Sequence, residues 1–229
     1  MVILSLDTSS TAGSAAVVRD GRVLVERAGD PSRTHAERLP RELMDVLDAA
    51  RCSLDTIDAF AVVTGPGSFT GLRVGLSTIQ GLAFARGLKV YPVSAFEALA
   101  RTTGTLHATA IWIDAHRHEV FATLLDGEGR TIEAPSSRPP VTTLDAWQSR
   151  LDTLPRVHFV GDGAVKSREI ILERVGDRAT VAETVPLLAG IAGQIAAADP
   201  QRGVSPHAVI PQYVRRPDAE LARDRKKFD

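Results

Sequence analysis

The sequence predicts an α/β fold made of two related halves, each a β-β-β-α-β-α unit around a mixed sheet. Two observations predict it. Short apolar runs that suit buried strands alternate with longer stretches of helical period. The pattern then restarts: one apolar run ends at Asp7 and another at Asp114, and each is followed by a second strand and an Asp-Gly turn. We therefore predict one half over 1–103 and the other over 104–229.

In the first half, Asp20-Gly21 separates two apolar runs, which is a strong hairpin signal. A later stretch carries Leu39, Leu43 and Leu47 at helical spacing. The predicted elements are strands over 2–6, 13–18 and 22–28, a helix over 33–50, a strand over 59–63, a helix over 69–86, a strand over 89–91 and a capped helix from 94.

The second half repeats this order, with Asp126-Gly127 at its hairpin turn and a glycine turn at 161–163. The segment over 134–156 contains four prolines and looks irregular. The predicted elements are strands over 107–113, 119–125, 130–133 and 157–160, a helix over 164–175 and a last helix over 185–198 that could pack back on the first half. Such a duplication matches the actin-like ATPase (ASKHA) architecture, in which two halves flank a nucleotide cleft.

Composition narrows the class of protein. The net charge of −1 supplies no global basic field for a nucleic-acid backbone. The single cysteine, Cys52, rules out an internal disulfide and fits a reducing compartment. The first apolar run is too short for a signal peptide, and no stretch reaches the length of a membrane span. We expect a soluble protein of the cytoplasm that does not enter a membrane.

The most informative motif is Gly65-Pro66-Gly67-Ser68-Phe69-Thr70-Gly71-Leu72-Arg73, between a predicted strand and a predicted helix. In one interpretation, amides near Gly65, Gly67 and Ser68 cradle a phosphate at the helix N-terminus. In the other, Gly67, Gly71 and Gly75 form a helix face for close packing. The motif lacks the lysine of a Walker-type loop. Residue chemistry favours packing but leaves both interpretations open.

Asp7, Thr8 and Ser9 follow the first strand and resemble the first phosphate loop of actin-like ATPases. An aspartate at a strand end can hold a metal-bound water, and the hydroxyls can contact phosphates. The alternative is an Asx or Ser/Thr turn that joins a hairpin. Both interpretations carry equal weight.

We predict no metal site and no catalytic set. His35 opens a helix, but the position one turn on is Leu39, so a paired-histidine site is absent. His116 and His118 alternate beside Asp114, where solvated loop histidines are the more common outcome. No Ser/His/Asp or Cys/His arrangement follows from the spacing, and Cys52 suits a structural role.

The predicted helix over 69–86 is apolar around most of its surface, so it must be covered on several sides, by the fold or by a partner. The basic tail, with Arg215-Arg216 and the run over 223–227, is by default a solvated end, with RNA contact as the minor alternative.

Taken together, several motifs resemble the TsaB (YeaZ) family from residue 1 to about 220. The Gly65–Gly75 block is the specific one. The departures lie at Ala115-His116-Arg117-His118 and at Phe121-Ala122. The supporting motifs are Ile3-Leu4-Ser5-Leu6-Asp7-Thr8-Ser9, Thr34-His35-Ala36-Glu37-Arg38-Leu39-Pro40, Ile113-Asp114-Ala115 with Glu119-Val120, and Pro211-Gln212-Tyr213-Val214-Arg215.

The resemblance implies a non-catalytic scaffold in the synthesis of threonylcarbamoyladenosine on tRNA, at the adenosine beside the anticodon. Its partners would be the TsaD-like transferase and a TsaE-like ATPase, with tRNA reached through the complex and a homodimer formed when the chain is alone. No cofactor is implied, although a nucleotide at a shared interface is possible; Asp7, Thr8, Ser9, Gly65, Gly67 and Ser68 would be its vestigial site. The two helices over 33–50 and 69–86 would form the partner interface. Its residues would be Leu39, Leu43, Leu47, Gly71, Leu72, Gly75, Leu76 and Ile79.

Two alternatives from other classes stay open. Asp7, Thr8, Asp114 and the two glycine turns would also suit an ATP-using enzyme of the actin-like superfamily, such as a small-molecule kinase. A peptidase that acts on TsaD is a third hypothesis, although the chain offers no recognisable pair of nucleophile and base.

Overall fold

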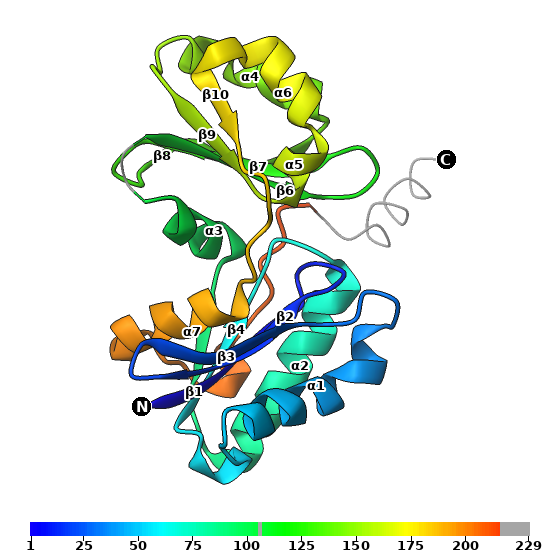
Figure 1. The fold of residues 1–229 in the computed structure, drawn as a ribbon, viewed down its shortest axis with the longest axis vertical. Coiled ribbons are helices and arrows are strands. Elements are labelled where there is room, and N and C mark those ends of the chain that lie inside the picture. Colours follow the sequence, from blue (N-terminus) through cyan, green and yellow to red (C-terminus); the bar gives the residue numbers. More distant parts are fainter. Residues whose placement is uncertain (105–106, 216–229) are drawn as a thin grey trace, which may run out of the picture.

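The structure of the protein, a computed structural model, describes residues 1–104 and 107–215. Within these residues, ten strands form two five-stranded sheets (Figure 1). The first sheet runs in the order β3 (Arg22–Ala28), β2 (Ser14–Arg19), β1 (Val2–Asp7), β4 (Ala59–Val63) and β5 (Val90–Val93). The second runs in the order β8 (Thr131–Arg138), β7 (Val120–Leu125), β6 (Ala108–Asp114), β9 (Val157–Val160) and β10 (Ala179–Val181).

The two sheets share one topology, which confirms the predicted duplication. In each sheet the central strand pairs antiparallel with the next strand of the chain and parallel with the fourth. Asp7 and Asp114 end the two central strands, as the sequence pattern predicts. The predicted class, an α/β fold with two mixed sheets, is therefore correct.

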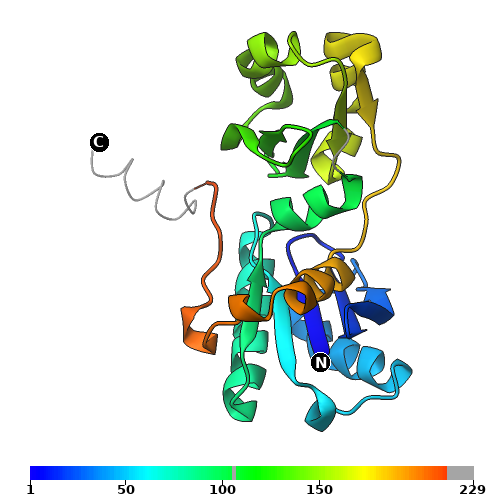
Figure 2. The ribbon, with the colours of Figure 1, turned by 90° about the vertical axis from the view of Figure 1, so that its left-hand side faces the viewer.

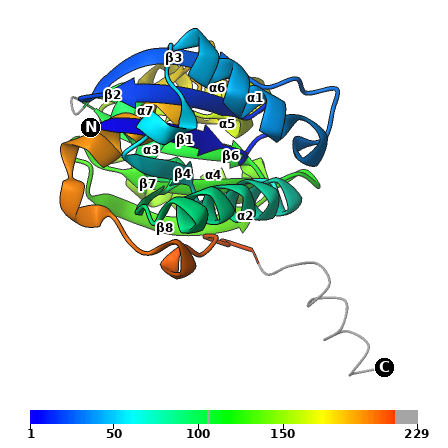
Figure 3. The same cartoon turned by 90° about the horizontal axis from the view of Figure 1, so that it is seen from below.

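Helices complete the layers around both sheets. They are α1 (His35–Ala49), α2 (Phe69–Arg86), α3 (Ala95–Thr103), α4 (Pro140–Leu151), α5 (Asp162–Lys166), α6 (Arg168–Val175) and α7 (Ala189–Ala198). Short 3-10 turns lie at η1 (Leu54–Thr56), η2 (Gly176–Arg178), η3 (Pro200–Arg202) and η4 (Pro206–Ala208). Seen from below, η4 lies next to α2 (Figure 3).

Successive side chains of β1 point to opposite faces of the first sheet, so its apolar residues belong to two core clusters. Leu4 and Leu6 of β1 pack with α1 and α2, whereas Ile3 belongs to the cluster that contains Ala196 of α7. Helix α7 follows the second sheet in sequence but contacts β1, β2 and β4, so the last helix does pack back on the first sheet. Conversely, α3 follows the first sheet and contacts β6. The two units thus exchange their last helices.

The N-terminus of α7 is held by polar groups of the first sheet. The amide of Ala189 donates to the Ser14 hydroxyl at 3.0 Å, and the amide of Gly190 donates to Glu26 at 2.7 Å. Helix starts leave such amides without partners inside the helix, and here strands β2 and β3 supply the acceptors. These bonds fix where α7 docks on the sheet.

Four sequence predictions need correction. The segment with four prolines is not irregular, because Pro140 occupies the first turn of α4, where proline is tolerated. The predicted helix over 164–175 is two helices that meet at Ser167. The last helix begins at Ala189 rather than 185. The turn after β7 is longer than Asp126-Gly127 and carries its positive φ at Gly129.

Candidate functional site

The predicted phosphate cradle lies where β1 ends and α2 begins, and part of it packs against the chain itself. The Ser68 amide donates to the Ser9 carbonyl at 2.7 Å, and the Ser68 hydroxyl accepts from the Gly71 amide at 3.2 Å. A Cβ atom at Gly67 would lie 2.3 Å from the Ser9 carbonyl oxygen, and one at Gly71 would lie 2.3 Å from that of Thr8. The glycine face of α2 therefore packs on residues 8 and 9.

Asp7 is enclosed at the end of β1. Its carboxylate accepts from the Ser9 amide at 2.8 Å, which is the predicted Asx-type turn. Burial raises the pKa of Asp7 above its ordinary value, although hydrogen bonds from Ser9 oppose the shift. The Asp7 carboxyl is therefore a poorer holder of a metal-bound water than an exposed aspartate would be.

The turn before α2 also contacts the C-terminal part of the chain. The Gly65–Pro66 peptide bond is cis, and Gly65 has a φ of +109°, a conformation that side-chain-bearing residues rarely adopt. A Cβ atom at Gly65 would lie 2.8 Å from the Gln212 carbonyl oxygen. The amide of Gln212 donates to the Thr64 carbonyl at 2.7 Å. Gly65 is thus required for a close approach of two backbones.

In the second half, Asp114 is the counterpart of Asp7, and a lysine of the chain lies beside it. Lys166 of α5 forms an ion pair with the Asp114 carboxylate. Burial would raise the pKa of Asp114, but hydrogen bonds from Lys166 and the His116 amide outweigh it and hold the pKa below its usual value. The Asp162 carboxylate accepts from the Asp114 amide at 2.9 Å. Asp114 is therefore already neutralised by its own chain.

These observations decide whether the nucleotide and metal ion implied by the fold would fit. The amide of Ser68 and the small-residue face of α2 are occupied by residues 8 and 9. Asp7 is buried, and Asp114 is paired with Lys166. Among the residues that the structure describes, no group of three or more potential metal ligands comes together. The residues do not fit a phosphate-bound metal ion.

His35 stands where the sequence indicated a lone histidine, and it is part of the fold. Its Nε2 lies 3.0 Å from the Ser10 carbonyl oxygen, and its Nδ1 lies 2.8 Å from a guanidinium nitrogen of Arg38. Burial, and secondly the charge of Arg38, lower the pKa of His35. Arg38, buried itself, also donates to the carbonyls of Thr11 and Ala12. This arginine, which the residue patterns did not single out, joins α1 to the loop after β1.

The apolar residues predicted to contact a partner lie inside this chain. Leu43 is 5% exposed and Leu76 3%, and both pack under the first sheet. The side chains of Leu39, Leu47, Leu72 and Ile79 belong to the same core cluster, while Gly71 and Gly75 face Thr8. A groove of about 460 Å³ remains open between α1 and α2. It is lined by Ala36, Leu39, Pro40, Arg73, Val74, Ser77 and Thr78.

The other residues that the sequence singled out do not come together in one site. His116 and His118 lie in the turn between β6 and β7, where residues 116, 117 and 118 all have φ between 53° and 61°. Cys52 is partly buried, with its sulfur 3.3 Å from a guanidinium nitrogen of Arg19. Arg215 is described, but Arg216 and the basic run over 223–227 lie outside the described residues.

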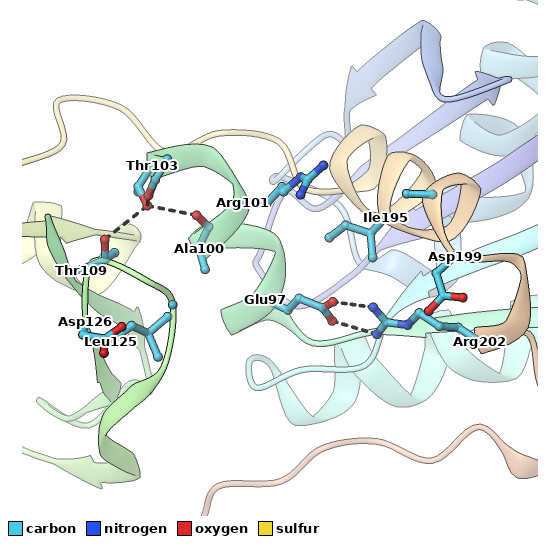
Figure 4. A pocket seen from close by; sticks show the side chains of 13 residues that line it. Glu97, Ala100, Arg101, Thr103, Thr109, Leu125, Asp126, Ile195, Asp199 and Arg202 are labelled. Atoms are coloured by element: carbon cyan, nitrogen blue, oxygen red, sulfur yellow. Dashed lines mark hydrogen bonds and ion pairs between the residues drawn. The ribbon is translucent and has the colours of Figure 1, made fainter. Parts of the chain in front are cut away.

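One hollow in the described part of the chain brings together none of the predicted site residues. It measures about 560 Å³ and lies between α3, the end of α7 and the turn after β7 (Figure 4). Arg202 faces Glu97 there in a two-pronged ion pair, one arm of which measures 2.9 Å. The charge of Arg202 is therefore satisfied within the chain.

The sequence of this chain is similar to those of known proteins. Residues 29–223 match the family model described as "TsaD: tRNA N6-adenosine threonylcarbamoyltransferase". An uncharacterized protein of Mycobacterium leprae is 32% identical over 96% of this chain, which spans only 56% of that relative's length. The tRNA threonylcarbamoyladenosine biosynthesis protein TsaB of Haemophilus influenzae is 38% identical over 53% of this chain and 52% of its own.

Solved structures agree. YeaZ from Pseudomonas aeruginosa is 31% identical, with a TM-score of 0.72 over 93% of this chain and 99% of its own. An activator of 2-hydroxyisocaproyl-CoA dehydratase from Clostridium difficile, solved with bound ADPNP, has a TM-score of 0.55 at 12% identity over 86% of this chain and 95% of its own, which shows the actin-like fold alone. From the family-model match and these similarities we conclude that the chain belongs to the TsaB (YeaZ) family, within the wider TsaD-type family.

Proposed function

We propose that the chain is a non-catalytic scaffold subunit in the synthesis of threonylcarbamoyladenosine on tRNA. Relatives named as tRNA threonylcarbamoyladenosine biosynthesis proteins, and the transferase family model, support the pathway. In this proposal the chain binds and activates a TsaD-like transferase, works with a TsaE-like ATPase, and meets tRNA only through the complex. Alone it forms a homodimer. Such work belongs in the cytoplasm, and no described helix is long and apolar enough to cross a membrane.

One observation carries the non-catalytic part of the proposal. In the described residues, the cradle that would face a phosphate is packed against Thr8 and Ser9, with the Ser68 amide already bonded to the Ser9 carbonyl. The second aspartate of the cleft is paired with Lys166. A hollow of about 400 Å³ opens on Gly67 and Ser68, but the Ser68 amide and the Asp114 carboxylate, which would face a phosphate and its metal ion, are already engaged within the chain. The features therefore favour a scaffold over an ATP-using enzyme.

A second observation supports partner binding through α1 and α2. The groove between them is open and lined by small or apolar side chains, among them Ala36, Pro40 and Val74. Large apolar side chains are exposed on the same two helices, with Met44 49% exposed and Phe84 66% exposed. Exposed apolar surface beside a groove is typical of protein interfaces. We propose that this surface binds the TsaD-like subunit, or a second copy when that subunit is absent.

The decisive experiment is co-expression of the chain with the TsaD-like protein of its own organism. We expect a stable complex by light scattering, and threonylcarbamoyl transfer to tRNA that needs this chain. Separate chains, or transfer at the same rate without this chain, would reject the scaffold role. Calorimetry of the isolated chain with ATP and magnesium tests the kinase-like alternative, for which micromolar binding lost in Asp7→Ala is the required result.

The peptidase alternative has less support. Among the described residues, His158 Nδ1 lies 2.8 Å from the Thr180 hydroxyl, on the neighbouring strands β9 and β10. That imidazole has no carboxylate partner in the described part of the chain, so the pair lacks the third group that orients a catalytic base. Cleavage of the TsaD-like protein on incubation with this chain is the result that would revive this hypothesis.

A further inference from the structure

The strap, defined here as residues 209–215, contains the Pro-Gln-Tyr-Val-Arg motif, to which the proposed function gives no role. It leaves η4, runs along α2 and reaches the second sheet (Figure 2). On the first half it is firmly held. Val209 is buried in the core, Gln80 donates to its carbonyl at 2.9 Å, and the Gln212 amide donates to Thr64.

Aromatic and cationic side chains fasten the strap to the first turn of α2. The rings of Phe69 and Tyr213 lie 5.0 Å apart, centre to centre. The Arg73 guanidinium stacks on Phe69 at 3.9 Å and donates to the Tyr213 hydroxyl at 3.1 Å. Such contacts stabilise a fixed position more than a mobile one, because each needs a defined orientation. The strap therefore arrives at the second half from a rigid base.

At its end the strap crosses to the other sheet. Arg215 donates to Glu119 at 3.0 Å and to the carbonyl of Ala115 at 3.0 Å, so it contacts both ends of the turn between β6 and β7. The Ser137 hydroxyl, donating at 2.6 Å, and Arg215 together lower the pKa of Glu119 below its ordinary value. Arg215 and Glu119 are both partly buried, with 25% and 29% of their side-chain surface exposed, and the bond between them is charge-assisted.

We propose that the strap is a latch that fixes the turn between β6 and β7, and with it the second sheet, relative to helix α2. Two features of the geometry favour this role. The latch joins segments about a hundred residues apart in sequence. It also closes on a turn of three consecutive residues with positive φ, a conformation that the surrounding contacts must hold in place. The inference is independent of the proposed partner.

Hydrogen exchange of the full chain tests the local part of the proposal. The Ala115 amide bonds to the Glu119 carbonyl and the Glu119 amide to His116, so both report opening of the turn. In Arg215→Gln and in Glu119→Gln we expect exchange over residues 115–121 to be about fivefold faster, with unchanged exchange in β1 and β4. The double variant should add little to either change. Arg156→Gln, an exposed arginine before β9, should change nothing.

Distances between spin labels test the orientation. Labels on cysteines placed at the exposed positions Ala85 and Glu128, in a Cys52→Ser background, span α2 and the second sheet. We expect Arg215→Gln to broaden the distance distribution and Arg156→Gln to leave it narrow. An unchanged distribution together with unchanged exchange would overturn the latch. Exchange that rises equally in β1 and β4 would overturn it too, because Arg215 would then support the whole fold rather than one turn.

Discussion

A Cβ atom at Gly75 would lie 2.1 Å from the Thr8 hydroxyl oxygen, which is nearer than any real Cβ contact. That hydroxyl is buried and finds no hydrogen-bond partner among the described residues. The contact between Gly75 and Thr8 shows what the glycine motif does in this chain. It brings helix α2 directly onto the loop after β1, for which the sequence left a phosphate-binding role open.

We expect Gly75→Ala to destabilise the fold by about 1–3 kcal/mol, as overpacking of a buried site does. Helical propensity alone favours alanine over glycine, so the loss must come from the clash with Thr8. Unfolding by urea, followed by circular dichroism, measures the change.

Gly81 is the matched control on the same helix, because a Cβ atom there would meet nothing within 4 Å. Gly81→Ala should stabilise the fold by up to about 1 kcal/mol. Thr8→Ala should rescue part of the loss in Gly75→Ala, since the hydroxyl and methyl groups in the way are removed. Equal effects at Gly75 and Gly81 would show that the close packing does not matter.

Sequence patterns predicted the layout of this fold well, because strand alternation and Asp-Gly turns are local signals. They missed β10, a three-residue strand whose burial depends on β9 beside it. They also left open what the glycine face touches, since nothing near Gly75 in sequence points to Thr8. Lys166 escaped notice for the same reason, and the prediction of a solvated end was wrong for Arg215, because their partners lie 52 and 96 residues away.

Lys166→Met should weaken the fold by less than about 1 kcal/mol at neutral pH, because the lysine is largely exposed. The expected effect depends on pH. The pKa of Asp114 is lowered from 3.8 in the folded state, so the stability gained from its ionised form is present above 3.8 and is lost as the pH falls below it. The free energies of unfolding of the parent protein and of Lys166→Met, measured from denaturation curves, should therefore differ at pH 7 and converge below pH 3.8. A constant difference would mean that packing of the lysine stem matters instead.

His35 should make the protein less stable in mild acid. Its pKa is lowered from 6.5 in the folded state, so the unfolded chain binds the proton first and stability falls as the pH drops through 6.5. In His35→Gln, the free energy of unfolding should vary less between pH 7 and 5. His158→Gln is the control for a second histidine with a lowered pKa, and it should leave the His35 component in place. Identical slopes for the parent and His35→Gln would contradict the assignment.

A test of the proposed partner surface needs substitutions that leave the chain folded. The leucines of the core are therefore unsuitable for it. Leu76→Glu would bury a charge in the first core and should unfold the chain, so its loss of binding would say nothing about an interface. Ser77 is exposed, lines the groove between α1 and α2, and follows Leu76 directly.

We therefore expect Ser77→Glu to weaken self-association and binding of the TsaD-like subunit at least tenfold, which corresponds to about 1.4 kcal/mol. The melting temperature of the dilute chain should stay near that of the parent, because the side chain touches solvent on the outer face of α2. Arg156→Glu, on the second half, is the control for added negative charge and should bind normally. Sedimentation of each variant, alone and with the partner, measures both equilibria. Binding that survives in Ser77→Glu would move the interface away from the α1–α2 groove.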